Sequence, residues 1–98
     1  MPYAILTKDK PDSLALRLAT RDVHIAYLDS HAAKLLAAGA LLNDDGSGGD
    51  GGLIIYDTDD RAVAEAFIDN DPFTKAGLFE SITIRRWRKA FLDGTKRM

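Results

Sequence analysis

The 98-residue sequence contains no cysteine, and this absence excludes several kinds of chemistry. Without thiols the chain cannot form disulfides, use a thiol nucleophile or build a zinc site from thiolates. A reducing compartment is compatible with this composition, although a lack of cysteine alone does not place the protein there.

Long hydrophobic runs and a surplus of positive charge are also missing. No stretch approaches the roughly 18–20 apolar residues of a membrane-spanning helix. The first residues do not show a charged region followed by a long apolar run, so no signal peptide is expected. Lys and Arg number 13 against 15 Asp and Glu, for a net charge of −2, whereas a nucleic-acid-binding surface usually needs a basic excess. We therefore expect a cytoplasmic protein that binds neither membranes nor nucleic acids.

The apolar content, by contrast, is sufficient for a core, because 46% of the residues are hydrophobic. A chain of this length makes one domain, which we expect to span residues 1–98, with the polar tail 88–98 frayed. A domain of this size buries only about 60–70% of its unfolded surface, so covering a face with a partner would help to stabilise it.

Apolar periodicity and turn residues predict six elements. Lys8 to Pro11 interrupts the first strand, Asp12 or Ser13 suits the start of a helix, and Gly39 suits its end. Thr58, Asp59 and Asp60 suit the start of a second helix, whose apolar stripe is Ala62, Val63, Ala66 and Phe67. The expected elements are a strand at 3–7, a helix at 14–38, strands at 40–42 and 53–56, a helix at 61–70 and a strand at 79–87.

The order β-α-β-β-α-β is typical of a ferredoxin-like α+β fold, with a four-stranded antiparallel sheet and both helices on one face. The apolar run 53–56 predicts a strand in the middle of the sheet. Because strands 3–7 and 53–56 carry apolar side chains on both faces, the open face of the sheet needs a cover. We expect a homodimer packed sheet to sheet.

Two segments allow other interpretations. Five of the ten residues at 43–52 are glycine, and Asp44, Asp45 and Asp50 offer oxygen atoms for a cation. The acidic spacing of a calcium loop is absent, so we expect a mobile hairpin and no metal. The basic cluster 85–89 could suggest nucleic acid, but alternation on an edge strand explains it better.

Several pieces of the sequence, taken in order, resemble the YciI-like (YCII-related) family of small dimeric α+β-barrel proteins. The most specific piece is Asp71-Pro72-Phe73 followed by Ala76-Gly77-Leu78-Phe79. The other matching pieces are Tyr3-Ala4-Ile5, Arg17-Leu18, Arg21, His24-Ile25-Ala26-Tyr27-Leu28, Gly39-Ala40-Leu41-Leu42, Ile82, Ile84 and Trp87. Two departures from the family pattern are Gly39-Ala40, where the family often has Gly-Pro, and Arg85-Arg86, where it often contains Pro.

The resemblance implies a ferredoxin-like fold of the dimeric α+β-barrel class and an active site built on His24 and Asp71. It also implies a relation to muconolactone isomerases in fold, and in one branch to dehydrochlorination of a chlorinated hydroxyhydroquinone. Such a reaction requires no cofactor.

The residues themselves support this site but leave a plain alternative. At about 3.6 residues per turn, Arg17, Arg21, His24, Leu28 and His31 share one helix face. Cations beside an imidazole could hold an anionic or phenolic substrate next to a proton carrier. A solvated helix face with a half-buried histidine would show the same pattern. We expect His31 to lie on the surface.

Asp71 followed by Pro72 is also an ideal start for a helix, because the carboxylate caps free N–H groups and proline suits the first helical position. Capping alone could explain the motif. The functional interpretation adds a hydrogen bond from His24 to Asp71, and one carboxylate can serve both roles.

The favoured hypothesis is therefore a cofactor-independent lyase or isomerase that acts on a cyclic or phenolic small molecule. In it, His24 shuttles a proton, Asp71 orients His24, Arg17 or Arg21 holds negative charge, and Phe73 and Phe79 wall the pocket. A non-catalytic module that binds a small ligand, a dimeric accessory domain, and a purely structural role for Asp71 are the alternatives. The enzyme hypothesis requires His24 and Asp71 within about 2.6–3.2 Å of one another beside a concave apolar pocket.

Overall fold

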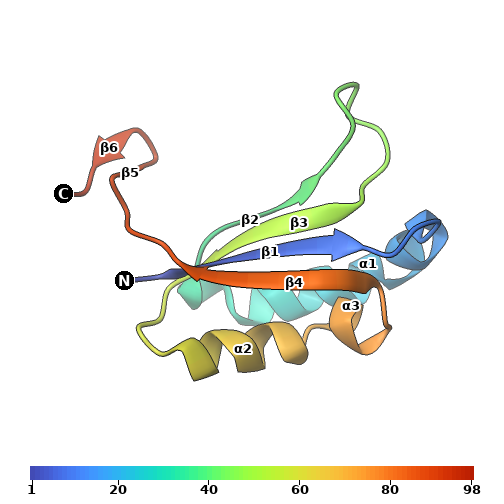
Figure 1. Ribbon diagram of the computed structural model, residues 1–98, viewed down its shortest axis with the longest axis horizontal. Coiled ribbons are helices and arrows are strands. Elements are labelled where there is room, and N and C mark those ends of the chain that lie inside the picture. Colours follow the sequence, from blue (N-terminus) through green and yellow to red (C-terminus); the bar gives the residue numbers. More distant parts are fainter.

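A computed structural model describes residues 1–98 as a four-stranded antiparallel sheet with its helices on one face (Figure 1). The strand order is β2-β3-β1-β4, so β3 lies inside the sheet as expected and β4 forms an edge. The ferredoxin-like α+β fold is confirmed. The elements are β1 (Tyr3–Asp9), α1 (Leu14–Ser30), the 3₁₀ turn η1 (Ala32–Lys34), β2 (Leu35–Leu41), β3 (Gly51–Tyr56), α2 (Arg61–Asp69), α3 (Pro72–Lys75), β4 (Phe79–Arg86), β5 (Phe91–Leu92) and β6 (Thr95–Lys96).

The core lies between the helix-covered face of the sheet and α2. Its buried members are Tyr3, Ile5, Ile54, Tyr56, Ala64, Phe67 and Ile68. Helix α1 contributes less, because Arg17 is its only buried residue and Tyr27 and Leu28 are only partly buried. The two helices therefore pack on the sheet unequally, and the space beneath α1 is less filled.

The first helix is shorter than predicted, ending at Ser30 instead of Ala38, and Gly39 lies within β2 instead of ending the helix. Near this end, the Ser30 hydroxyl donates to the Tyr27 carbonyl oxygen at 2.6 Å, which competes with helical hydrogen bonding. The Ala- and Leu-rich segment that follows pairs with β3, from Leu35 opposite Tyr56 to Leu41 opposite Gly51. Pairing across the sheet thus overrides the helical preference of alanine and leucine.

The first strand is longer than predicted, because it continues through Lys8 to Asp9. The Asp9 backbone N–H donates to the Asp50 carbonyl oxygen at 2.7 Å, and its side chain is buried against Arg17. Ser13 occupies the cap position of α1, but its hydroxyl donates to the Pro11 carbonyl oxygen at 3.3 Å instead of capping the helix, and Asp12 does not cap it either.

Helix α2 begins where predicted, with the Asp60 carboxylate accepting from the Ala62 N–H at 2.9 Å. The stripe that it buries differs from the predicted one, since Ala64, Phe67 and Ile68 face the sheet. Val63, expected inside, is 44% exposed. Burying both of the large side chains Phe67 and Ile68 turns the helix away from the predicted stripe.

The segment after β4 forms a separate two-stranded sheet from β5 and β6, drawn apart from the main sheet in Figure 1. Its expected fraying stays a prediction. Among the helices, none combines the length and the apolar character that crossing a membrane requires.

Candidate active site

The centre of the site is the contact between His24 on α1 and Asp71 at the start of α3. The His24 Nδ1 lies 2.9 Å from Asp71 Oδ1 and 3.0 Å from Oδ2. The side chain of Asp71 is fully buried, and that of His24 is 14% exposed. The structure therefore joins residues that are 47 positions apart in the sequence at the distance that the enzyme hypothesis requires.

Asp71 is also the cap of α3, because its Oδ1 accepts a hydrogen bond from the Phe73 N–H at 2.9 Å. Pro72 takes the first helical position. The capping and the histidine-orienting interpretations thus hold together. A carboxylate only accepts hydrogen bonds, so the Nδ1 of His24 is the donor in this contact.

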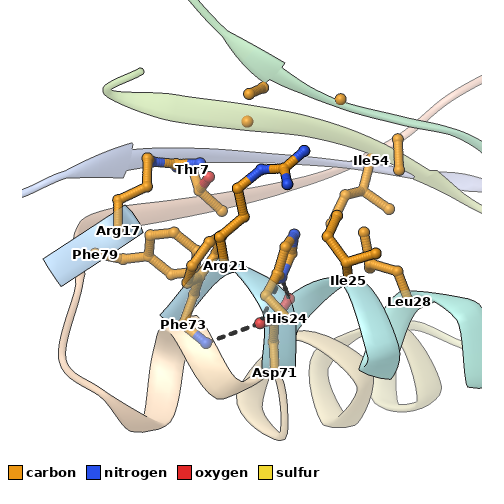
Figure 2. A pocket seen from close by; sticks show the side chains of 14 residues that line it. Thr7, Arg17, Arg21, His24, Ile25, Leu28, Ile54, Asp71, Phe73 and Phe79 are labelled. Carbon is orange, nitrogen blue, oxygen red and sulfur yellow. Dashed lines mark hydrogen bonds and ion pairs between the residues drawn. The ribbon is translucent and has the colours of Figure 1, made fainter. Parts of the chain in front are cut away.

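The orientation of the His24 ring is fixed from a second side by Phe73. The two rings stack with centroids 3.9 Å apart and planes inclined by 16°. Phe73 is buried, and Phe79 meets its ring edge-on at 6.0 Å. With Nδ1 held by Asp71 and one ring face covered, Nε2 is the group that remains for chemistry. Figure 2 shows this nitrogen pointing away from Asp71 toward the sheet.

A cavity of about 230 Å³ lies between α1 and the sheet, at the free side of the histidine ring. It exists because the strands carry small residues beneath this part of α1. These are Ala38, Gly39 and Ala40 on β2 and Gly52 on β3. The other lining residues are Thr7, Arg17, Arg21, His24, Ile25, Leu28, Ile54, Asp71, Phe73 and Phe79. All six residues expected at the site therefore line one cavity.

Arg17 lines the cavity, but its charge is already engaged. Its Nε donates to Asp9 Oδ2 at 2.7 Å and its Nη2 to Asp9 Oδ1 at 3.0 Å. Both side chains are almost completely buried, at 9% and 3% exposure. The guanidinium carbon also lies 4.8 Å from the centre of the Phe73 ring. Arg17 thus packs against the aromatic ring that orients His24.

Asp9 was not identified from the sequence, because it lies in the polar run Lys8 to Pro11, which we expected to interrupt the first strand. Continuing the alternation of Tyr3, Ile5 and Thr7 by two residues would have placed Asp9 on the buried face. An acidic residue there requires a buried cation nearby.

Arg21 differs from Arg17, because it is exposed and forms no ion pair. Figure 2 shows its side chain reaching toward the sheet beside the His24 ring. Arg21 is therefore the cation of this cavity that is available to a ligand.

Two further aromatic groups, Tyr27 on α1 and His31 just after it, lie beyond the cavity. The Tyr27 hydroxyl donates to the Phe67 carbonyl oxygen at 2.6 Å. Burial, followed by the charge of Asp71, raises the pKa of Tyr27 to about 12, so this phenol is not a base near neutral pH. His31, expected on the surface, is instead half-buried against Tyr27 and Phe67, and it does not line the cavity.

The two departures from the family pattern lie in different places. Gly39 and Ala40 line the cavity. Arg86 lies beside the N-terminus and donates to the Tyr3 hydroxyl at 2.7 Å. In the glycine-rich loop, the Asp45 carboxylate accepts from the Ser47 backbone N–H at 2.9 Å and hydroxyl at 2.6 Å, which occupies it within its own turn.

Comparison with known sequences gives concordant matches. The profile of the YCII-related domain matches residues 1–88. Protein YciI of Escherichia coli O6:H1 is 35% identical over 98 residues, which covers 93% of this chain and 100% of that protein. An uncharacterized protein of Haemophilus influenzae is 30% identical with the same coverage of both chains.

Solved structures agree with this match. The 5-chloro-2-hydroxyhydroquinone dehydrochlorinase TftG of Burkholderia phenoliruptrix, in complex with 2,5-dihydroxybenzoquinone, is 35% identical with a TM-score of 0.83, over 90% of this chain and 94% of that one. Rv0793 of Mycobacterium tuberculosis has a TM-score of 0.56 over 91% of this chain and 97% of its own, at 15% identity, and shows the fold alone. The dimeric α+β-barrel class of fold is confirmed.

Proposed function

Since this chain belongs to the YCII-related domain family, we propose that it is a small-molecule enzyme of the lyase or isomerase type in which His24 transfers a proton. The observation that carries the proposal is the contact of 2.9 Å between His24 Nδ1 and the buried Asp71 carboxylate, at the wall of a cavity. A carboxylate that holds Nδ1–H leaves the Nε2 lone pair free to accept a proton, and it stabilises the imidazolium that then forms.

The other lining residues supply what such a step needs. Arg21, the unpaired cation, stabilises negative charge that develops on a bound oxygen atom. Phe73 and Phe79 form an apolar wall, and Phe73 holds the imidazole plane. We assign Arg17 a positioning role in place of substrate binding, because Asp9 already neutralises its charge.

The size of the cavity limits the substrate. Pockets for drug-sized ligands span about 300–1,000 Å³, so a cavity of about 230 Å³ suits a single ring with small substituents. The similar dehydrochlorinase is named for a chlorinated, hydroxylated ring and binds 2,5-dihydroxybenzoquinone. We extend this class, a monocyclic ring bearing oxygen substituents, to the present chain.

We further propose that the protein is a homodimer packed through the open face of the sheet. Leu6 on β1 and Leu53 on β3 lie opposite one another in the ladder and are 41% and 38% exposed. Leu41 on β2 adds a third exposed side chain, at 45%. Covering these side chains would remove apolar surface from water.

The test is turnover of 5-chloro-2-hydroxyhydroquinone, followed by chloride release, together with a panel of hydroxylated aromatic rings and lactones followed by absorbance. His24→Asn should lower kcat about 100-fold or more, which is the usual contribution of general acid–base catalysis. His31→Asn is the matched control, since it changes the other histidine outside the cavity, and it should retain turnover.

The main alternative, a module that binds a small ligand without converting it, predicts a different outcome. In that case no ring would be turned over by the unmodified protein, and His24→Asn would lower ligand affinity alone. Equal turnover by His24→Asn and the unmodified protein would refute the proton-transfer role.

A further inference from the structure

Thr7 is a cavity residue that the proton-transfer step does not use. It lies on β1 facing the helices and is 7% exposed. Its hydroxyl forms no hydrogen bond within the protein. The protein leaves no completely buried side-chain oxygen unpartnered, so this hydroxyl is open to the cavity that Thr7 lines.

The neighbouring strand keeps the hydroxyl uncovered. Gly52 lies directly opposite Thr7 in the β1–β3 ladder. A methyl group in place of the Gly52 hydrogen would lie 3.4 Å from the Thr7 hydroxyl oxygen. Because Gly52 has no side chain, the hydroxyl faces open space at this edge of the cavity.

Thr7 and His24 occupy opposite walls of the same cavity, on β1 and on α1 (Figure 2). In a cavity of about 230 Å³, a ring that meets the free nitrogen of His24 also comes close to the sheet. A buried hydroxyl is satisfied only by a hydrogen-bonding group, and an apolar ring edge placed there would leave it unpaired.

We propose that Thr7 determines specificity by hydrogen-bonding an oxygen substituent of the ring held against His24. This inference rests on the proposed function and assigns a residue to the recognition of its substrate. A hydroxyl, carbonyl or oxyanion on the sheet side of the ring pairs with Thr7, whereas a ring without oxygen there is disfavoured.

The test uses two pairs of variants that differ by the hydroxyl, with 2,5-dihydroxybenzoquinone as the probe. In the first pair, the unmodified protein is compared with Thr7→Val, which keeps the shape of the side chain and suits a strand. In the second pair, Thr7→Ser is compared with Thr7→Ala. Titration calorimetry gives the affinity, NMR signals of the His24 ring report whether the probe lies at the site, and thermal unfolding checks each fold.

Within each pair, loss of the hydroxyl should weaken binding about 10-fold, as expected for one hydrogen bond to a charged or polar ligand group. Thr7→Ser should bind within about 3-fold of the unmodified protein. Equal affinity within both pairs, with the His24 signals still shifting, would overturn the role of Thr7 and leave the proposed function standing. A probe that fails to bind the unmodified protein, or that leaves its His24 signals unchanged, would overturn both.

Discussion

Asp71 serves two neighbours with one carboxylate, since it caps α3 through the Phe73 N–H and holds Nδ1 of His24. The two roles lie on the same residue but are chemically separable. Asparagine is as good a helix cap as aspartate, whereas its amide can donate to the histidine and favour the other tautomer. One substitution can therefore keep the helix and remove the orientation of His24.

We predict that Asp71→Asn folds with near-normal stability but lowers kcat about 100-fold or more, as a misdirected tautomer does in other histidine–aspartate pairs. Asp71→Ala should in addition lose about 0.5–2 kcal/mol of unfolding free energy with the cap. Asp60→Ala is the matched control, because Asp60 caps α2 away from the cavity. Its free energy of unfolding, measured in urea, should fall by a similar amount, while its turnover should be retained.

Tyr27 makes the free energy of unfolding depend on pH in the alkaline range. Burial and the charge of Asp71 raise its pKa from 10.0 to about 12, so folding favours the neutral phenol. The stability that this contributes is complete below about pH 10 and is lost as the pH rises through about 12. Burial also raises the pKa of Tyr56, so the phenolate absorbance should show more than one delayed tyrosine. Tyr27→Phe should remove the step near pH 12. A titration unchanged by Tyr27→Phe would contradict the assignment.

Among the elements, β1 and α1 are joined by the buried ion pair between Asp9 and Arg17. Removing one member of such a pair leaves an uncompensated charge in the interior. We predict that Asp9→Asn lowers the free energy of unfolding by about 3–5 kcal/mol. The double variant Asp9→Leu, Arg17→Met should recover most of this loss, which urea unfolding would measure. If Asp9→Asn alone were neutral, the pair would not stabilise the fold.

The element order could be predicted because turns and caps are local features of the sequence. Asp60 and Asp71 mark helix starts through groups within two residues of themselves. The end of α1 could not be predicted in this way, since the segment 35–38 becomes a strand only through its pairing with β3.

The site was predictable only in part. His24 and Asp71 were identified by family resemblance, and helix periodicity placed Arg17, Arg21 and His24 on one face. Asp9 and Thr7 were not identified, because their importance depends on burial in the assembled sheet.

For the molecule as a whole, the helices cover only one face of the sheet, and this has a consequence for assembly. The helices cover one face, while Leu6 and Leu53 stand exposed on the other. We predict that sedimentation gives a mass near twice the 10.7 kDa of one chain. Leu53→Glu should shift the protein to the monomer, because a charge cannot be buried there without a partner. Leu18→Glu, on the exposed side of α1, should leave the assembly unchanged. A monomeric unmodified protein would refute the dimer.

The cavity has walls of different kinds. His24, Asp71 and Phe73 come from the helices, whereas the floor beneath them, on the strands, includes the small residues Ala38, Ala40 and Gly52. Exchanges on this floor would reshape the room for a ring without disturbing the imidazole. Under the proposed function, small changes in two strands would therefore alter which rings fit, while His24 keeps its place.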